Sequence, residues 1–595
     1  MHIYARDCTS KVVPAARSLN PPAKIRISRM RPTWILLASY LSASSASGLL
    51  FAQAATYAGQ VEQWGIQEVV VRSAHTYANP VTDVNLQCRF RSGTKEVLAN
   101  GFFDGQGAWK VRLMPEIQGS WTFTTISNDP DLNQKTGTFN VGAPSAGNHG
   151  PVRVRNQYHF AYADGTAYFP LGTTTYGGVG GDLRSRQRTV ALLSHSPFNK
   201  TRFQLLAGGR GGGGGPFLTG PDGTRDYKRP NPEFYSQVEA SVLDLQTLGV
   251  EADVIFFTPY DRTPGGLSSM GSENDEAYLR YAVSRLAAFR NVWWTVSNEF
   301  ELHQVPKDWN KLGTLISQAD PYKHLLGIHN CCMAFFDNSQ PWVDHVILQD
   351  ITMQRLAADP RNNAWLELDA RKIGKPVIVD EYGYEGNNGM TWGSFSAREI
   401  VDMHWAITLA GAYASHGESY SGQASPTGEF IGDSPVRLGF LKKVMMEAPY
   451  EEMEPAPDIV NTDTPNISIL AKRGTYYLFM FWPPRQNATW NLGFFGPATP
   501  SKPLPIPSRD GTFAGTPATS SEFKIGEGVF RVDLIDPWAM KVTNLGYTRG
   551  PTQTIRARIT PGIIRLVKVD HAEPGATIAP VSQLGTGGRG GRGGQ

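Results

Sequence analysis

Short apolar strands alternate with amphipathic helices over the central part of this chain, and this alternation constrains its fold more than any other feature. The clearest helix follows Asn231, which can cap it, while Pro232 suits its first turn and Gly249 ends it. We count eight strands of this kind, at residues 168–172, 201–205, 253–257, 292–296, 325–328, 345–348, 376–379 and 412–415.

Eight strand–helix units predict a closed parallel barrel, because parallel strands need helical crossovers and must be covered on their outer face. A doubly wound open sheet is the alternative, but it usually has fewer strands and an early glycine-rich phosphate motif. We therefore expect an α/β fold of the TIM (β/α)8 barrel type over residues 148–448.

The segments on either side of the barrel alternate as half-buried antiparallel strands do. Trp109, Trp121 and Phe123 occupy apolar positions between polar ones, and turns rich in glycine and asparagine separate the runs. We expect a β-sandwich over residues 55–147, with these three aromatic side chains in its core, and a second β-sandwich over residues 449–572. The Gly/Arg-rich end, residues 573–595, predicts a disordered tail.

The start of the chain has the pattern of a secretory signal. Residues 30–54 run from a basic start at Arg31 through an apolar stretch to the small residues at Ala52 and Ala54. We expect a signal region over residues 1–54, with translation starting at Met30, cleavage near Ala54 and a secreted or periplasmic product. An anchoring helix is the alternative, but the cleavage-like end favours removal, so no stable membrane insertion is expected after cleavage.

Charge and composition exclude several classes of protein. The 56 Lys and Arg are balanced by 53 Asp and Glu and form no long block of one sign, so we expect no nucleic-acid partner. Hydrophobic residues at 41% with 18% charged residues exclude a disordered chain. No His-Glu-x-x-His motif or clustered Cys/His pattern indicates a metal, and we expect no cofactor. The glycine run at 208–215 lacks the ending of a phosphate loop, and no Gly-x-Ser-x-Gly elbow is present.

Two glutamates follow strands of the predicted barrel, where the reactive groups of such barrels lie. Glu299 follows strand 292–296 and Glu381 follows strand 376–379. Two carboxyl groups about 5 Å apart cleave a glycosidic bond with retention, one as nucleophile and the other as acid and then base. A single strand-end carboxylate more often caps a helix or pairs with an arginine, but a pair on the fourth and seventh strands favours catalysis.

Five short motifs accompany this pair, at residues 231–234, 248–253, 259–262, 380–386 and 416–420. With them the chain resembles clan-A retaining glycoside hydrolases, and more closely the apiosidase-like barrel hydrolases that carry an N-terminal Ig-like domain of unknown function and a C-terminal β domain. The resemblance implies that Glu299 is the acid/base and Glu381 the nucleophile, and that Asn298 binds the sugar hydroxyl next to the anomeric carbon. Ser297 stands where the family often has alanine, a departure that leaves these roles intact.

Other side chains at strand ends are suited to hydrogen-bond sugar hydroxyls or to stack on a sugar ring, although packing or ion pairing is the alternative for each. Arg202 is the strongest candidate, because an arginine on the second strand could orient the nucleophile. Asp380 is expected to point to the other side of its strand from Glu381 and to be structural. The remaining candidates for hydrogen bonding are Tyr260, Asp261, His329, Gln349, His416 and Glu418, and those for stacking are Trp392 and Tyr176.

The sequence thus predicts an exported glycoside hydrolase that cleaves O-glycosyl bonds in a poly- or oligosaccharide by a retaining mechanism with two glutamates. One alternative is a catalytically inactive carbohydrate-binding or surface protein. The other is a polysaccharide lyase or an inverting enzyme on the same barrel. The separation of the two carboxylates would distinguish this alternative from a retaining hydrolase.

Overall fold

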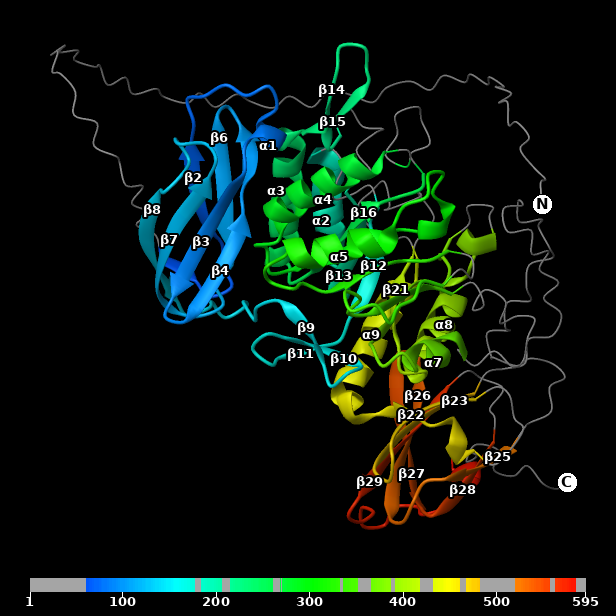
Figure 1. Cartoon of the computed structure of the whole chain (residues 1–595). Helices are drawn as coiled ribbons and strands as arrows, with labels where there is room; N and C mark the ends of the chain where they lie inside the picture. The colour runs from blue at the N-terminus through cyan, green and yellow to red at the C-terminus, as the bar shows by residue number, and fades with distance from the viewer. Residues whose placement is uncertain are drawn as a thin grey trace, which may run out of the picture. The chain divides into compact units, whose positions relative to one another are not determined.

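The computed structural model describes residues 60–176, 183–205, 215–260, 268, 270–331, 335–350, 365–386, 391–417, 432–460, 467–481, 520–556 and 562–584. All of them belong to one compact unit. In Figure 1 the chain runs from blue N-terminal sheets through a green and yellow barrel to an orange and red C-terminal sheet. Within this part of the chain, no helix is both long and apolar enough to cross a membrane. The predicted signal region precedes the described residues.

The N-terminal part contains two sheets joined by the short helix α1 (Pro80–Asp83). Trp109, Trp121 and Phe123 are at most 2% exposed, so the prediction that they are core residues is confirmed. The first sheet has the order β1 (Gln60–Glu62), β8 (Thr136–Gly142), β7 (Gly119–Ser127), β3 (Leu86–Ser92) and β4 (Lys95–Asn100), and the second β2 (Gln67–Arg72), β6 (Ala108–Leu113) and β5 (Phe102–Gly105).

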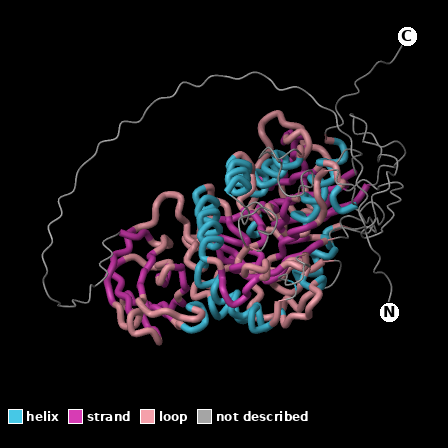
Figure 2. Tube along the Cα trace, turned by 90° about the horizontal axis from the view of Figure 1, so that it is seen from above, coloured by secondary structure: helices cyan, strands magenta, loops and turns pink. Residues whose placement is uncertain are grey.

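Eight parallel strands form the central sheet, as predicted. A backbone bridge between His329 and Ile347 links its two outer strands, so the sheet closes into a barrel. In Figure 2 the helices, in cyan, flank these magenta strands. The order is β18 (Leu326–Gly327), β17 (Val292–Ser297), β16 (Glu251–Phe257), β13 (Lys200–Gln204), β12 (Leu171–Thr174), β21 (Tyr413–His416), β20 (Val377–Glu381) and β19 (Val346–Gln349).

The first barrel strand starts three residues later than predicted, at Leu171. Pro170 has no N–H to donate to a ladder, so the strand breaks there. Tyr168, which we expected in the barrel, instead ends a small antiparallel sheet of β9 (Val152–Arg155), β10 (His159–Tyr162) and β11 (Ala167–Tyr168).

Local signals explain the helices that cover the barrel. The Asn231 side chain accepts a hydrogen bond from the N–H of Glu233, and Gly249 adopts a φ of 69° just beyond the helix, as the sequence predicts. The helices are α2 (Leu183–Ser194), α3 (Pro232–Thr247), α4 (Ser272–Leu286), α5 (Trp309–Ala319), α7 (Trp365–Arg371), α8 (Ala397–Leu409) and α9 (Ser434–Glu447), with the hairpin β14 (Phe217–Thr219) and β15 (Arg225–Pro230) and the 3-10 turns η2 (Phe300–Leu302) and η3 (Thr391–Gly393).

The C-terminal part has its own apolar core, and this core extends beyond residue 572. Val581 and Leu584 are buried in it, so the predicted tail is ordered at least to Leu584; the apolar side chains in this stretch give it a surface to pack with. Six strands have the order β22 (Glu454–Pro455), β23 (Ile467–Lys472), β24 (Tyr476–Phe481), β29 (Ile563–Val569), β26 (Val529–Asp536) and β27 (Lys541–Arg549), and β25 (Ser520–Lys524) pairs with β28 (Thr552–Arg556); η4 (Tyr450–Glu452), η5 (Pro457–Ile459) and η6 (Val581–Gln583) are 3-10 turns.

Candidate active site

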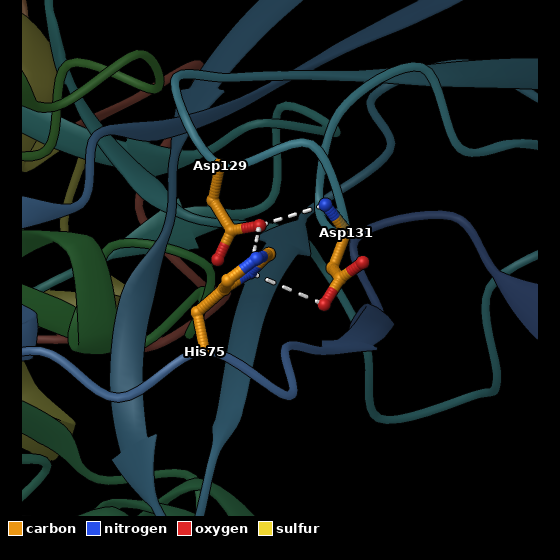
Figure 3. Close-up of side chains that lie close together, drawn as sticks. All are labelled: His75, Asp129 and Asp131. Carbon is orange, nitrogen blue, oxygen red and sulfur yellow. Dashed lines mark hydrogen bonds and ion pairs between the residues drawn. The ribbon is translucent and has the colours of Figure 1, made fainter.

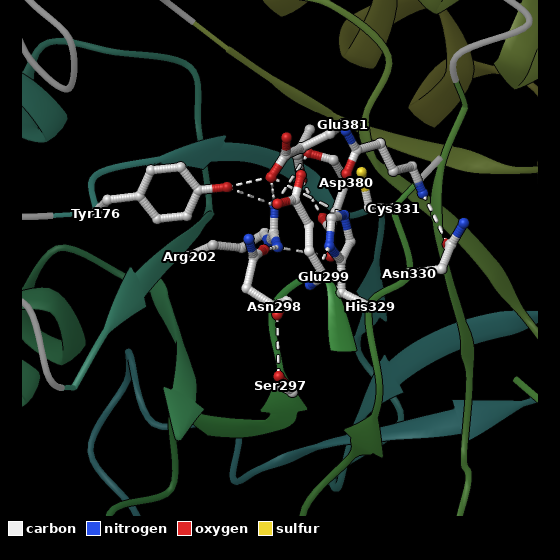
Figure 4. A network of polar contacts seen from close by, with 12 residues as sticks. Tyr176, Arg202, Ser297, Asn298, Glu299, His329, Asn330, Cys331, Asp380 and Glu381 are labelled. Atoms are coloured by element: carbon white, nitrogen blue, oxygen red, sulfur yellow. Dashed lines mark hydrogen bonds and ion pairs between the residues drawn. The ribbon is translucent and has the colours of Figure 1, made fainter. Parts of the chain in front are cut away.

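Glu299 and Glu381 lie at the carboxyl ends of two barrel strands. Strand β17 ends two residues before Glu299, and Glu381 is the last residue of β20. Figure 4 shows the two side chains converging on one place. Glu299 has a left-handed backbone with a φ of 42°, which costs a non-glycine residue about 1–2 kcal/mol. Such strained residues cluster at functional sites, where the surrounding fold holds them.

The buried guanidinium of Arg202, on β13, connects the residues of the site. Its Nη1 lies 3.3 Å from Glu381 Oε1, and its Nη2 donates to Asn298 Oδ1 at 2.8 Å. The side chain therefore orients both Glu381 and the amide before Glu299 (Figure 4). Arg202 is fully buried, and these contacts are with protein groups.

Each glutamate has a tyrosine partner. The Tyr176 hydroxyl donates to Glu381 Oε1 (Figure 4), and the Tyr260 hydroxyl donates to Glu299 Oε2. Tyr260 was a predicted sugar ligand, whereas the contact of Tyr176 with Glu381 was not foreseen. From the sequence, Tyr176 was expected only as an aromatic ring that could stack on a sugar. Asn298 Nδ2 also donates to the Tyr260 hydroxyl, at 3.3 Å.

The electrostatics of the site favour a protonated Glu299. Burial raises its pKa to about 7, and the negative charge of Glu381 acts in the same direction. Hydrogen bonds from Tyr260 and Gln349 oppose the shift because they stabilise the carboxylate. A pKa near neutrality suits a group that must first give and then recover a proton.

His329 follows β18 and lies between the two glutamates. The N–H of Glu299 donates to His329 Nδ1 at 3.4 Å, so the neutral ring carries its proton on Nε2, which lies 3.9 Å from Glu381 Oε1. Burial lowers the pKa of His329 well below its ordinary value, and the charge of Arg202 adds to this effect. The ring is thus neutral and fully buried. In this position it holds protein groups of the site, whereas the sequence predicted a sugar ligand.

A layer of buried charges lies inside the barrel next to the site. Lys200 Nζ is 2.6 Å from Asp253 Oδ2 and 3.1 Å from Asp380 Oδ1, and Ser415 donates to Asp380 at 2.5 Å. Burial alone would raise the pKa of Asp380, but Lys200 and Arg202 hold it below its ordinary value.

The expectation that Asp380 and Glu381 point to opposite sides of their strand is wrong. Asp380 Oδ2 lies 3.4 Å from Arg202 Nε, and Glu381 contacts the same guanidinium. The register between β19 and β20 shifts here, with Leu348 opposite Val379 and the next residue opposite Glu381. The extra residue breaks the alternation, so both carboxylates face the barrel interior.

Trp392 packs against Tyr384, at the side of the site. Its ring meets that of Tyr384 edge-on at 5.3 Å, and its carbonyl accepts from the N–H of Tyr384 at 2.8 Å. The Tyr384 hydroxyl in turn donates to that of Tyr176 at 3.4 Å. Trp392 is half-buried and therefore has surface left for a ligand.

His416 is fully buried rather than open to substrate. Its ring stacks on Phe198 at 5.1 Å, and its Nε2 lies 3.8 Å from Glu385, which accepts hydrogen bonds from the start of α9. The structure thus places His416 among groups that support the barrel end. The predicted ligands Asp261 and Glu418 lie outside the described residues.

A second polar cluster lies in the N-terminal part. Oxygen and nitrogen atoms of His75, Asp129 and Asp131 lie within 4.8 Å of one another (Figure 3), which is close enough to hold a metal ion. Asp129, however, accepts from the N–H of Asp131 and from Tyr77, both at 2.7 Å, and Asp131 accepts from the N–H of Ala74 at 3.0 Å. These hydrogen bonds join two loops and explain why the three side chains lie together, so we assign the cluster no metal.

Comparison with known families connects this geometry to an enzyme class. Residues 155–424, which contain the barrel strands and both glutamates, match the family described as "Apiosidase-like, catalytic domain". The barrel is an apiosidase-like catalytic domain. Residues 60–128, in the N-terminal sheets, match a domain of unknown function, DUF5060. No curated protein matches the chain.

Solved structures place the apiosidase-like domain among glycoside hydrolases. A Bacteroides vulgatus protein described as a "putative glycoside hydrolase" is 28% identical, with a TM-score of 0.70, over 86% of this chain and 100% of its own. A family 5 glycoside hydrolase from the same organism shares the fold at 13% identity, with a TM-score of 0.51, over 71% of this chain and 93% of its own. The chain therefore has the fold of a glycoside hydrolase.

Proposed function

We propose that this protein is a retaining glycoside hydrolase in which Glu381 is the nucleophile and Glu299 the acid/base. The observation that carries the proposal is the pairing of the two glutamates at the ends of the fourth and seventh barrel strands, with different surroundings. Glu299, with a pKa of about 7, holds a proton near neutral pH, while Glu381 is held by the cation of Arg202. A proton donor and a nucleophile are the two groups that retention requires.

The reaction runs in two displacements. In the first, a Glu381 oxygen attacks the anomeric carbon, the glycosidic bond breaks, and the Glu299 proton passes to the departing oxygen. A covalent glycosyl ester on Glu381 results. In the second, Glu299, now a carboxylate, takes a proton from water, the water oxygen attacks the anomeric carbon, and the ester bond to Glu381 breaks. Both glutamates return to their starting states.

The neighbours of the pair support these steps. Arg202 and Tyr176 both contact Oε1 of Glu381, which leaves its Oε2 as the oxygen suited to attack. Asn298 is fixed by Arg202 at its Oδ1 and has its Nδ2 within reach of Tyr260, which suits an amide that binds a sugar hydroxyl next to the reacting carbon.

The proposed substrate is a poly- or oligosaccharide, and the enzyme is proposed to act outside the cytoplasm. The glycoside hydrolase fold supports the proposed substrate class, and the signal pattern at residues 30–54 supports the proposed export. Mass spectrometry of the protein recovered from an expressing cell is expected to find an N-terminus close to residue 55. A mature protein that begins at Met1 or Met30 would contradict export by this signal.

An inactive carbohydrate-binding protein is disfavoured because the site keeps both glutamates together with their hydrogen-bond partners, Tyr176 and Arg202 for Glu381 and Tyr260 for Glu299. A lyase or an inverting enzyme differs in the separation of its carboxylates. A crystal structure should place the carboxyl carbons of Glu299 and Glu381 about 5 Å apart for retention, whereas inversion needs about 6.5–9.5 Å.

Kinetics of two variants test the assignment of roles. Glu381→Ala should lower kcat by several orders of magnitude, because no glycosyl ester can form without it. Glu299→Ala should still release an activated aryl leaving group in the first step, then stall, and recover rate with azide, which needs no general base. The readout is turnover of aryl glycosides with good and poor leaving groups, after a screen of plant and algal glycans has identified the sugar.

The exposed Glu522, in the C-terminal part, provides a control, since Glu522→Ala should leave kcat unchanged. Loss of activity in both active-site variants without azide rescue of Glu299→Ala would mean that the roles are exchanged or the chemistry is different. Full activity in both would refute the mechanism.

A further inference from the structure

A cavity of about 380 Å³ lies between the N-terminal sheets and helix α4. Its wall on the barrel side consists of Ala277, Arg280, Tyr281 and Ser284, which recur at three- and four-residue steps and so form one face of that helix. The cavity thus opens on the outer wall of the barrel, whereas the two glutamates lie at the ends of the barrel strands. Its volume falls in the range of small-molecule sites.

The walls combine aromatic rings with uncharged amides. Phe102 and Tyr281 line the cavity, and Asn85, Gln87 and Asn100 line it from the sheet side. Among the lining residues only Arg280 is charged, and no carboxylate is present. Rings with a few placed hydrogen-bonding groups form a surface that recognises neutral polar ligands.

Gln87 and Asn100 form a matched donor and acceptor pair. Gln87 Nε2 donates to Asn100 Oδ1 at 2.9 Å. The Gln87 carbonyl oxygen and the Asn100 amino group remain, side by side, as one acceptor and one donor. Two neighbouring hydroxyl groups of a sugar ring present the complementary pattern, since each hydroxyl can donate and accept.

The buried indole of Trp109 forms part of the apolar wall. This residue lines the cavity and is 2% exposed, and its Nε1 has no hydrogen-bond partner among the described residues. Contacts with Phe103 at 5.0 Å and Tyr77 at 6.1 Å hold the ring in place. That nitrogen has almost no accessible surface, so it does not face the open volume, and the ring contributes apolar wall to the cavity.

The rest of the same interface shows that the cavity is preformed. Beside it, Glu239 on α3 binds both Arg112 and Arg285, at 2.9 and 2.6 Å, and Arg285 also packs on Phe102 at 4.5 Å. Charged groups fixed in this way hold the N-terminal part against the barrel. The cavity therefore persists between two surfaces that are joined nearby, and a ligand would not need to open it.

We propose that this cavity binds a neutral sugar unit of a glycan, as a second carbohydrate site apart from the catalytic one. The proposal rests on the proposed function only in that the enzyme and the site would share one polymeric substrate. The half-buried Phe103 supplies ring surface, and the half-buried Gln87 and Asn100 supply the hydrogen bonds. Holding a polymer here would raise its local concentration at the active site.

Affinity gel electrophoresis of the full chain tests the proposal, with Glu381→Gln as the background so that the polymer is not cleaved. The probes are xylan, glucomannan and arabinogalactan. At least one of them is expected to retard the protein. A Gln87→Ala/Asn100→Ala double variant, which removes hydrogen bonds, and Ala277→Phe, which fills the cavity, should each raise the apparent Kd at least tenfold. Gln118→Ala, an exposed amide of the same domain outside the cavity, is the matched control.

The same cavity substitutions, with Glu381 restored, should leave kcat/KM on an aryl glycoside unchanged and lower it on the polymer. Thermal melts check folding, and if the double variant unfolds then Ala277→Phe decides. Absence of retardation by every probe, or retardation that both cavity variants retain, would overturn the inference. Retardation that depends on the cavity in a protein without hydrolase activity would leave this inference standing and refute the proposed function instead.

Discussion

Glu299 is held both at its backbone and at its carboxyl group. Its backbone is left-handed, its N–H is bound by His329, and its carboxyl group is bound by Tyr260. Burial and the charge of Glu381 raise its pKa to about 7. Both effects require the folded barrel, because an exposed glutamate beside an asparagine titrates near pH 4.3.

The first prediction concerns pH. The proposed acid must be protonated in the first step, so kcat/KM should fall as pH rises through about 7. Tyr260→Phe removes a donor that stabilises the carboxylate, so the midpoint of this alkaline limb should move to higher pH. Rates measured from pH 5 to 9 on one aryl glycoside give the limb.

Tyr176→Phe is the matched control, because its hydroxyl contacts Glu381 instead of Glu299. It should lower the rate without the upward movement of the alkaline limb. A limb that stays in place in Tyr260→Phe would mean that a group other than Glu299 controls it.

At the scale of the strands, four elements contribute to the charged layer inside the barrel. Lys200 comes from β13, Asp253 from β16, Asp380 from β20 and Ser415 from β21. A Cβ on Gly172 of β12 would lie 2.1 Å from the Ser415 hydroxyl, so a glycine is required there for the serine to fit. Asp380 of this layer also contacts Arg202, so the layer supports the barrel end that carries the two glutamates.

The second prediction tests this layer. Lys200→Met leaves Asp253 and Asp380 buried without their shared cation, which should lower the free energy of unfolding by about 3–5 kcal/mol. Urea unfolding followed by tryptophan fluorescence measures the loss. Lys541→Met, on an exposed position of β27, should change it by no more than about 0.5 kcal/mol. Equal stability of the two variants would show that the buried charges do not depend on one another.

At the scale of the whole molecule, the N-terminal sheets and the barrel share a buried ionic contact. Arg112 of β6 and Arg285 of α4 both bind Glu239 of α3, and Arg112 also donates to the Arg285 carbonyl at 2.7 Å. Tyr322 of the barrel donates to Arg112's carbonyl at 3.3 Å and accepts from the N–H of Met114. These contacts couple the stability of the two parts.

The third prediction follows from this coupling. Glu239→Ala leaves two buried guanidinium groups short of a partner and should cost about 3–5 kcal/mol of unfolding free energy. Differential scanning calorimetry should show the N-terminal part and the barrel melting together in the unmodified chain. Asp244 lies on the same helix as Glu239 and forms a more exposed pair with Arg186 of α2, so Asp244→Ala should cost less than about 1 kcal/mol. Separate N-terminal and barrel transitions in the unmodified chain would argue against the coupling.

Local patterns in the sequence predicted the elements that depend on neighbouring residues. Hydrogen bonds and side-chain periodicity within a few residues set the Asn231 cap, the glycine at 249 and the eight apolar strands. These features can therefore be recognised from the sequence alone. The same reasoning placed Glu299 and Glu381 at strand ends. It failed for Asp380, because the shift in register depends on β19, which alternation along β20 does not reveal.

By itself, then, the sequence determined the order of strands and helices, the barrel and the positions of its two glutamates, because periodicity and capping act locally. Only the tertiary structure decided the partners of those glutamates. Tyr176 and Glu381 are 205 positions apart, and Arg202 and Asn298 are 96 apart, so their contacts exist only once the barrel has closed. The raised pKa of Glu299 and the cavity beside α4 likewise arise from burial between distant segments, which no local pattern records.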